Sequence, residues 1–158
     1  MKADFIFFGG QSNMQGQTES LDKVIENPQN FEYRLLTDSL IPLNNPVGED
    51  IGELLLASHL GNGSLVPHFA NEYTKVTGNN VVAVHVAKGA TTISQWLKGS
   101  LEGKERYAKT VEKIRGALTK AEANKKYYVW LQGESDALNS TSEEEYCKML
   151  TKLKMKRW

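Results

Sequence analysis

The sequence has little cysteine, no long apolar run and no net charge. Its single cysteine, Cys147, excludes a disulfide within the chain. The apolar run at residues 5–8 is too short for a signal peptide or a transmembrane helix, so a cytoplasmic location without membrane association is expected, with secretion left open if a leader has been removed. Nineteen basic and nineteen acidic residues cancel, which gives no overall field that would favour nucleic acid.

Repeats, low-complexity stretches and linkers are also absent, which predicts one domain over residues 1–158. Apolar segments alternate between strand and helix spacing. The expected strands are 5–8, 81–86, 127–131 and, more weakly, 33–36; the expected helices are 66–76, 107–121 and 146–153. This alternation predicts an α/β fold with a mainly parallel sheet that helices cover on both faces. The proline- and glycine-rich region 15–63 is expected to form loops that wall a substrate site.

Polar, glycine-containing segments follow three of the expected strands. They are Gly-Gly-Gln-Ser-Asn-Met at 9–14, Ala-Lys-Gly-Ala-Thr-Thr at 87–92 and Gln-Gly-Glu-Ser-Asp at 132–136. Open parallel sheets bind ligands outside the carboxyl ends of their strands. The three segments are therefore expected to converge on one site.

Ser12 is the best candidate for a nucleophile, because a hydroxyl on a tight turn after a buried strand is open to substrate. The turn does not match the Gly-x-Ser-x-Gly elbow of α/β-hydrolases. Two other interpretations stay open at this point: Ser12 could cap the following helix, or the loop could cradle a phosphate, although the glycines fit neither common phosphate motif.

Acyl transfer also needs hydrogen-bond donors for a developing oxyanion. The Gly89 amide and the Gln132 side chain are suitable, although Gly89 alone could be a plain turn glycine. Glu134 can only accept when ionised and is given a supporting role. Glu134 and Asp136 could suggest a metal site, but no histidine or further carboxylate lies at ligand spacing, so neither a metal nor a cofactor is expected.

Two of these blocks, Gly-Gln-Ser-Asn-Met at 10–14 and Trp-Leu-Gln-Gly-Glu-Ser-Asp at 130–136, together resemble the sialate O-acetylesterase and acetylxylan-esterase-related group of SGNH hydrolases. The segment 88–96 resembles the middle block of that group. The resemblance implies a flavodoxin-like three-layer sandwich and an acetylated carbohydrate substrate. It also implies site roles: Ser12 as nucleophile, its amide with Gly89 and Gln132 as the oxyanion hole, and Gln11, Asn13 and Glu134 in substrate binding or support.

The Asp-x-x-His block that ends the family pattern is missing from the sequence. His85 lies inside an expected strand and is interpreted as a hydrogen-bonded core residue, and His68 as a surface or boundary residue. Nothing in the sequence places His59 at the site. Cys147 is expected to be a packing thiol within its helix. These observations predict a domain that is incomplete at its C-terminus, without the last strand and helix.

Three hypotheses follow for the function. The first is a serine esterase that deacetylates carbohydrates through Ser12. The second is a catalytically impaired remnant that binds sugar or assembles with a partner, and the third is a flavodoxin-like module for a phosphate-bearing ligand. If strand 127–131 forms an open sheet edge, self-association or a C-terminal helix folded over the strand is expected to cover it.

Overall fold

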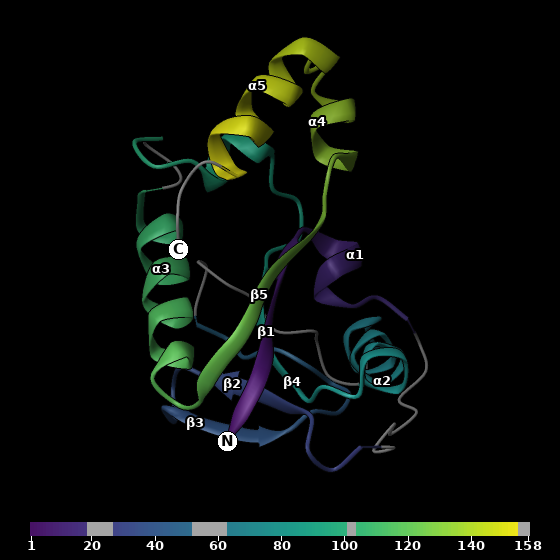
Figure 1. The fold of residues 1–158 in the computed structure, drawn as a ribbon. Helices are drawn as coiled ribbons and strands as arrows, with labels where there is room; N and C mark the ends of the chain where they lie inside the picture. The colour runs from purple at the N-terminus through teal and green to yellow at the C-terminus, as the bar shows by residue number, and fades with distance from the viewer. Residues whose placement is uncertain (19–26, 52–62, 101–103, 155–158) are drawn as a thin grey trace.

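One five-stranded sheet organises the computed structural model of the protein, which describes residues 1–18, 27–51, 63–100 and 104–154. The strands are β1 (Lys2–Gly10), β2 (Phe31–Arg34), β3 (Ser39–Pro42), β4 (Val81–Ala87) and β5 (Glu122–Leu131). Their order is β3-β2-β4-β1-β5, and only the pair β2–β3 is antiparallel. Strand β1 thus runs between β4 and β5 and is parallel to both (Figure 1).

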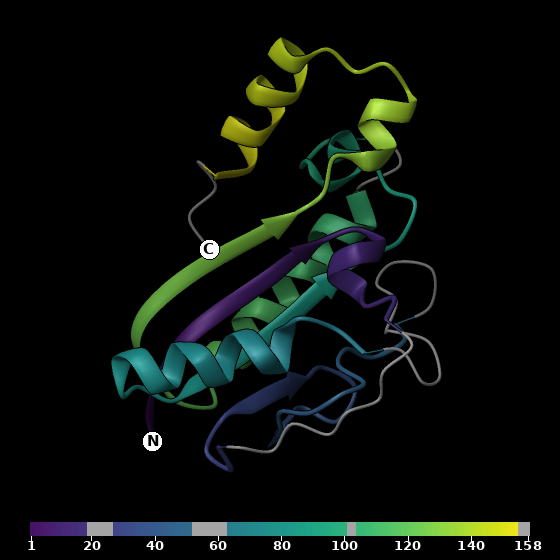
Figure 2. The ribbon, with the colours of Figure 1, turned by 90° about the vertical axis from the view of Figure 1, so that its right-hand side faces the viewer.

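Helices cover both faces of this sheet. They are α1 (Ser12–Gln15), α2 (Val66–Thr77), the 3-10 turn η1 (Ile93–Trp96), α3 (Lys104–Leu118), α4 (Glu134–Leu138) and α5 (Glu143–Lys154). Helix α3 lies on one face, α1 and α2 lie on the other, and α4 and α5 lie beyond the end of β5 (Figures 1 and 2). Within the described ranges, no helix combines the length and the apolar character needed to cross a membrane.

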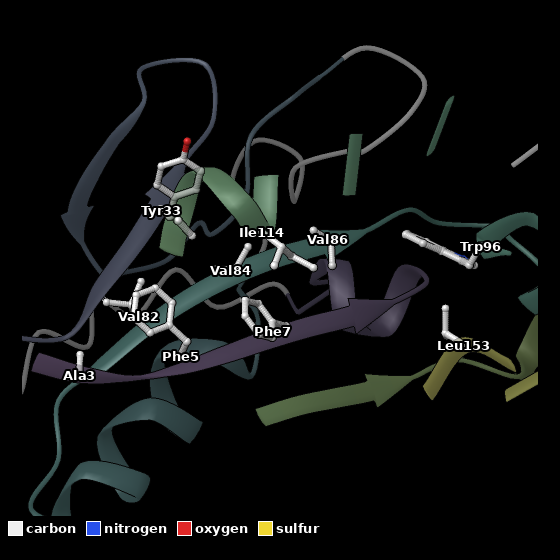
Figure 3. Packing of buried hydrophobic residues seen from close by; sticks show 11 residues of the cluster. Ala3, Phe5, Phe7, Tyr33, Val82, Val84, Val86, Trp96, Ile114 and Leu153 are labelled. Atoms are coloured by element: carbon white, nitrogen blue, oxygen red, sulfur yellow. The ribbon is translucent and has the colours of Figure 1, made fainter. Parts of the chain in front are cut away.

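The core is split into two layers by the alternation of side chains along the strands. Phe5 and Phe7 pack on the α3 side with Ile114, whereas Ile6 and Phe8 pack on the α2 side with Val66. Figure 3 shows the first layer, which extends from Tyr33 past Val84 to Trp96 and Leu153. Burial of each such large side chain contributes roughly 1.5–3 kcal/mol. The continuous apolar runs are therefore the signature of strands that are covered on both faces.

The structure confirms the α/β sandwich and most of the predicted elements. The weakest strand prediction, 33–36, was placed two residues too late, because the backbone turns at Leu35–Asp38 and brings β3 back antiparallel to β2. Neither the turn nor β3 was predicted, since the region 15–63 was expected to be rich in loops with one weak strand. Helix α5 confirms the amphipathic segment 146–153: its Leu153 is buried in the core layer of Trp96.

A buried carboxylate ties together the amino ends of the strands. Asp4 is fully buried and accepts hydrogen bonds from the Tyr73 hydroxyl, at 2.6 Å, and from the side-chain amides of Asn79 and Asn124. It also accepts the backbone N–H of Lys125. Although burial opposes the charge, these donors hold the pKa of Asp4 below its usual value. The network joins β1, α2 and the start of β5 at the end of the sheet opposite to the converging polar segments.

Strand β5 is the outer strand of the sheet on this side within the described residues, with β1 as its partner. Its Tyr127 and Leu131 side chains are 39% and 38% exposed, so the strand offers apolar surface beside unpaired backbone groups. Helix α5 does not supply the cover, because it packs against η1. Self-association through this edge stays an expectation.

We predict that the weight-average mass of the protein rises with concentration in sedimentation experiments. Tyr127→Lys or Leu131→Lys should suppress the association, because charges on an edge strand oppose pairing. Val76→Lys, at an 83% exposed position on α2, is the control and should leave it unchanged. A protein that is strictly monomeric at all concentrations would show that the edge is tolerated in solution.

Candidate active site

The three polar segments meet at the carboxyl ends of β1, β4 and β5, as the sequence predicts. Gly10, the last residue of β1, is in register with both Ala87 and Leu131. The Lys88 N–H donates to the Gly10 carbonyl at 3.1 Å, and the Gln11 N–H donates to the Leu131 carbonyl at 3.2 Å. Backbone hydrogen bonds thus continue the sheet one residue beyond the strands and hold the three turns side by side.

Ser12 is the first residue of α1 and is half-exposed. The N-cap of this helix is Gln11, and no side-chain hydrogen bond caps it. The interpretation of Ser12 as a capping side chain therefore finds no support. As a residue of the first helical turn, Ser12 also has a backbone N–H that has no acceptor within the helix.

Gly89 lies directly against Ser12. A Cβ built on Gly89 would lie 3.6 Å from the Ser12 Cβ and 3.3 Å from Gln15 Oε1. The absence of a side chain therefore opens the space in front of Ser12. In this structure the Gly89 N–H donates to Gln15 Oε1 at 2.8 Å, and Gln15 is buried. The proposed oxyanion donor is thus paired with a side-chain oxygen in the free protein.

The Gln132 carboxamide is held by partners on both of its ends. Its Nε2 lies 2.5 Å from Asp136 Oδ2, 2.9 Å from the Thr91 carbonyl and 3.2 Å from Gln11 Oε1. Its Oε1 accepts from the Tyr146 hydroxyl at 2.8 Å. Because an amide nitrogen carries two hydrogens, both are used inside the protein. Donation to an oxyanion would require one of these bonds to give way, and the role of Gln132 stays a prediction.

Gln11 is in a supporting position. The side chain is 3% exposed, and its Oε1 accepts from the backbone N–H groups of Ser135, at 3.2 Å, and Gly133, at 3.4 Å, as well as from Gln132. Its Nε2 donates to the Ser135 hydroxyl. The residue before Ser12 therefore fastens α1 to the turn between β5 and α4.

Asn13 and Glu134 form an exposed pair across the same junction. The Asn13 Nδ2 lies 2.5 Å from Glu134 Oε1, so the carboxylate faces an amide donor from the residue after Ser12. Both side chains lie at the surface next to the converging turns. Their place is compatible with contact to a substrate, which stays a prediction.

Sequence reasoning did not assign a role in the site to Asp136, although this carboxylate is 2% exposed. Oδ2 accepts from the Ile93 N–H at 2.8 Å and from Gln132, and Oδ1 accepts from the Thr141 hydroxyl at 3.1 Å. The signal in the sequence was its position four residues after Gln132, which places the two side chains together across the first turn of α4. No group of three or more histidine, cysteine or acidic residues fit to hold a metal occurs within the described ranges.

None of the histidines that the structure describes is placed as a base for Ser12. His85 is buried, as predicted, and its Nε2 lies 2.9 Å from the Met14 carbonyl, which can only accept. Burial lowers the pKa of His85 to about 4, so the ring is neutral near pH 7. His68 is exposed on α2, and His59 lies outside the described residues. The prediction that Cys147 is a packing thiol within its helix is wrong, since Cys147 is exposed.

The surface of the described residues has several hollows. One of about 330 Å³ opens beside Gln132 between α4 and α5, and its lining includes Asp136, Thr141 and Tyr146. A larger one of about 610 Å³ lies at α3 and shares no residue with the converging turns. The smaller hollow is therefore the one that is relevant to the site.

Comparisons with known proteins give a family for the chain and solved structures to which it is similar. The sequence profile of a carbohydrate esterase family, sialic acid-specific acetylesterase, matches residues 2–156. A solved structure of an Arabidopsis thaliana protein is 21% identical with a TM-score of 0.76, over 96% of this chain and 66% of that one. A carbohydrate acetylesterase from Xanthomonas citri is 17% identical with a TM-score of 0.48, over 92% of this chain and 36% of its own. The curated proteins searched contain no match.

Gly89→Ala should lower ester turnover by up to about 10²-fold, because a displacement of the reacting groups by an ångström or less is costly. The added methyl group would press on Gln15 Oε1 and narrow the space before Ser12, while the fold should keep its thermal midpoint. Ala90→Gly, in the same turn, adds no atoms and serves as the control. Equal turnover in Gly89→Ala and the wild type would remove Gly89 from the site.

The free energy of unfolding should decrease as the pH is lowered, because of His85. Its pKa is about 4 in the folded protein and about 6.5 when unfolded, so the stabilising contribution is complete above pH 6.5 and is lost as the pH falls towards 4. The loss should reach about 3 kcal/mol. Chemical unfolding at several pH values would measure it, with His85→Gln as the non-titrating control. If the two proteins lose stability in parallel, His85 does not cause the effect.

Proposed function

We propose that this chain, which belongs to the sialic acid-specific acetylesterase family of carbohydrate esterases, removes acetyl groups from carbohydrate esters through a covalent intermediate on Ser12. The observation that carries the proposal is the place of Ser12: half-exposed, at the junction of three strand ends and directly against a glycine. A serine in that position can approach an ester carbonyl without hindrance from a neighbouring side chain.

The chemistry consists of two acyl transfers. Ser12 Oγ attacks the acetyl carbonyl carbon and gives up its proton, the carbonyl oxygen becomes an oxyanion, and the bond to the sugar oxygen breaks as that oxygen takes a proton. Water then attacks the acetyl-serine and releases acetate, which restores the hydroxyl. No metal or redox cofactor is needed for these steps.

The oxyanion is assigned to the Ser12 and Gly89 backbone amides and the Gln132 side chain. The assignment is supported by the convergence of these three donors at the strand ends. In the free protein, however, the Gly89 and Gln132 donors are already hydrogen-bonded to other acceptors. The oxyanion would have to replace Gln15 Oε1 on the Gly89 N–H and one of the three acceptors around Gln132 Nε2. Part of the binding energy would therefore be used to exchange these partners.

Among the residues that the structure describes, no histidine is placed to take the Ser12 proton. The sequence has no Asp-x-x-His block, His85 is buried with its Nε2 facing the Met14 carbonyl, His68 is on the surface of α2, and His59 lies outside the described residues. A serine hydrolase that lacks one member of its triad keeps roughly 10³–10⁴-fold acceleration over water, from oxyanion stabilisation and binding. We therefore propose slow turnover for this chain.

The same observations favour one alternative, a chain that binds acetylated sugar with little hydrolysis. It would use the same surface, with Asn13 and Glu134 as contacts. Titration calorimetry with an acetylated sugar separates the two proposals, because binding without release of acetate supports the alternative.

Ser12→Ala should abolish the residual hydrolysis of activated esters and of a panel of acetylated sugars. Acetate release and the appearance of an acetyl adduct on Ser12 in mass spectra are the measurements. Ser39→Ala, on the far edge strand β3, is the matched control and should retain full activity. Hydrolysis that survives in Ser12→Ala would exclude the acyl-serine mechanism, whereas fast turnover dependent on Ser12 would show that a base is present.

A further inference from the structure

Asp136 joins three segments that meet only at the site. It is buried at the start of α4 and accepts from Ile93 of η1, from Gln132 at the end of β5 and from Thr141 before α5. A carboxylate this deeply buried is stable only when it is hydrogen-bonded, and here each of its oxygens has a donor. Its loss would leave donors of all three segments without their acceptor.

The partners of Gln132 also decide which way its carboxamide points. The oxygen and nitrogen ends of an amide have nearly the same shape, so the orientation depends on the polarity of the neighbours. The Trp130 Nε1–H, which can only donate, donates to the Tyr146 hydroxyl at 3.1 Å. The Tyr146 hydrogen is therefore directed to Gln132, where it reaches Oε1 and the backbone carbonyl, each at 2.8 Å.

On the other end, the Asp136 carboxylate and the Thr91 carbonyl accept only, and they require the nitrogen. A flip of the amide would place Oε1 against two acceptors, and the Tyr146 hydrogen would keep only the backbone carbonyl as its acceptor. Asp136 and the Thr91 carbonyl thus select one orientation, which the Tyr146 hydroxyl supports, with Nε2 towards the segments that carry Ser12 and Gly89.

We propose that Asp136 is a positioning residue for the esterase site, which acts by fixing the Gln132 carboxamide and, through the Ile93 N–H, the segment that follows Gly89. The proposal rests on the proposed function, but the geometry on which it depends can be tested without turnover. Asp136 is 2% exposed, and in this proposal it acts through the groups that it orients.

The matched control is Asp4, because it is also a fully buried carboxylate with several donors, but it lies at the opposite end of the sheet. Substitution of either aspartate removes a buried acceptor and should lower stability. Only substitution of Asp136 should change the orientation of the Gln132 side-chain amide.

The first measurement is NMR of the Gln132 side-chain amide and the Ile93 backbone amide. In the wild type, the charge-assisted hydrogen bond to the Asp136 carboxylate should shift one Gln132 amide proton downfield. Asp136→Ala should return that proton to an ordinary position and speed the hydrogen exchange of Ile93. Asp136→Asn should give a Gln132 proton shift and an Ile93 exchange rate between those of the wild type and Asp136→Ala. Its side-chain carbonyl can still accept, while its side-chain amide donates to Thr141. Asp4→Ala should leave both signals in place.

Tyr146→Phe tests the same orientation at the Oε1 end of the Gln132 carboxamide. This variant replaces Asp136→Ala as the test if Asp136→Ala does not fold. Loss of the Tyr146 hydroxyl as a donor to Oε1 should weaken the preference for one orientation and allow a second set of Gln132 amide signals to appear. Gln132 signals that are the same in Tyr146→Phe, Asp136→Asn and wild type would overturn the proposal.

The second measurement is ester turnover. Asp136→Ala should lower kcat about 10²–10³-fold with a small effect on KM, as expected when an oxyanion donor is misplaced. Asp4→Ala should keep the kcat of the wild type. A kcat that does not change although the Gln132 signals move would overturn the positioning role. Failure of the proposed function would appear separately, as hydrolysis that does not depend on Ser12.

Discussion

The parallel pairing of β1 with both β4 and β5 is the constraint on which the site depends. It sets the carboxyl ends of three strands in register at Gly10, Ala87 and Leu131 and continues as hydrogen bonds into the turns. Gly10 is required at this point, because its φ is +154° and a Cβ would collide with the Leu131 carbonyl oxygen. The chain can therefore bring its serine turn against β5 only with a glycine at the end of β1.

Hydrogen bonds of side-chain amides and of one carboxylate then connect the three turns to one another. The Gln11 side chain accepts from the backbone of the β5–α4 turn, and the Gln132 amide donates to the Thr91 carbonyl. The Asp136 carboxylate accepts from the Ile93 N–H at the start of η1. These side chains are bonded to groups from other segments, which makes the arrangement specific but also interdependent. The same satisfaction limits the chemistry, because the groups best placed to stabilise an oxyanion already have partners in the free protein.

Much of the fold could be predicted from the sequence, because buried strands and amphipathic helices leave local patterns. The runs 5–8 and 81–86 have no polar break apart from His85, and the glycines after the strands mark the turns. Strand β3 could not be predicted, since its four residues depend on pairing with β2. Similarly, the sequence shows that Ser12, Gly89 and Gln132 lie at strand ends, but not which hydrogens are engaged. The bonds of Gln15 to Gly89 and of Asp136 to Ile93 exist only once distant segments have met.

The thin cover of β5 has a consequence for the dynamics of the site. Most residues of this strand are exposed or half-exposed, in contrast to the fully buried β4, and β1 is its neighbour in the sheet. Proteins open in cooperative units whose free energies follow their burial, so β5 with α4 forms a candidate foldon of low opening free energy. Since Gln132 and Asp136 belong to that unit, each opening would dismantle the site while the rest of the sheet persists. The fraction of competent molecules would then be set by this sub-global equilibrium and not by global unfolding.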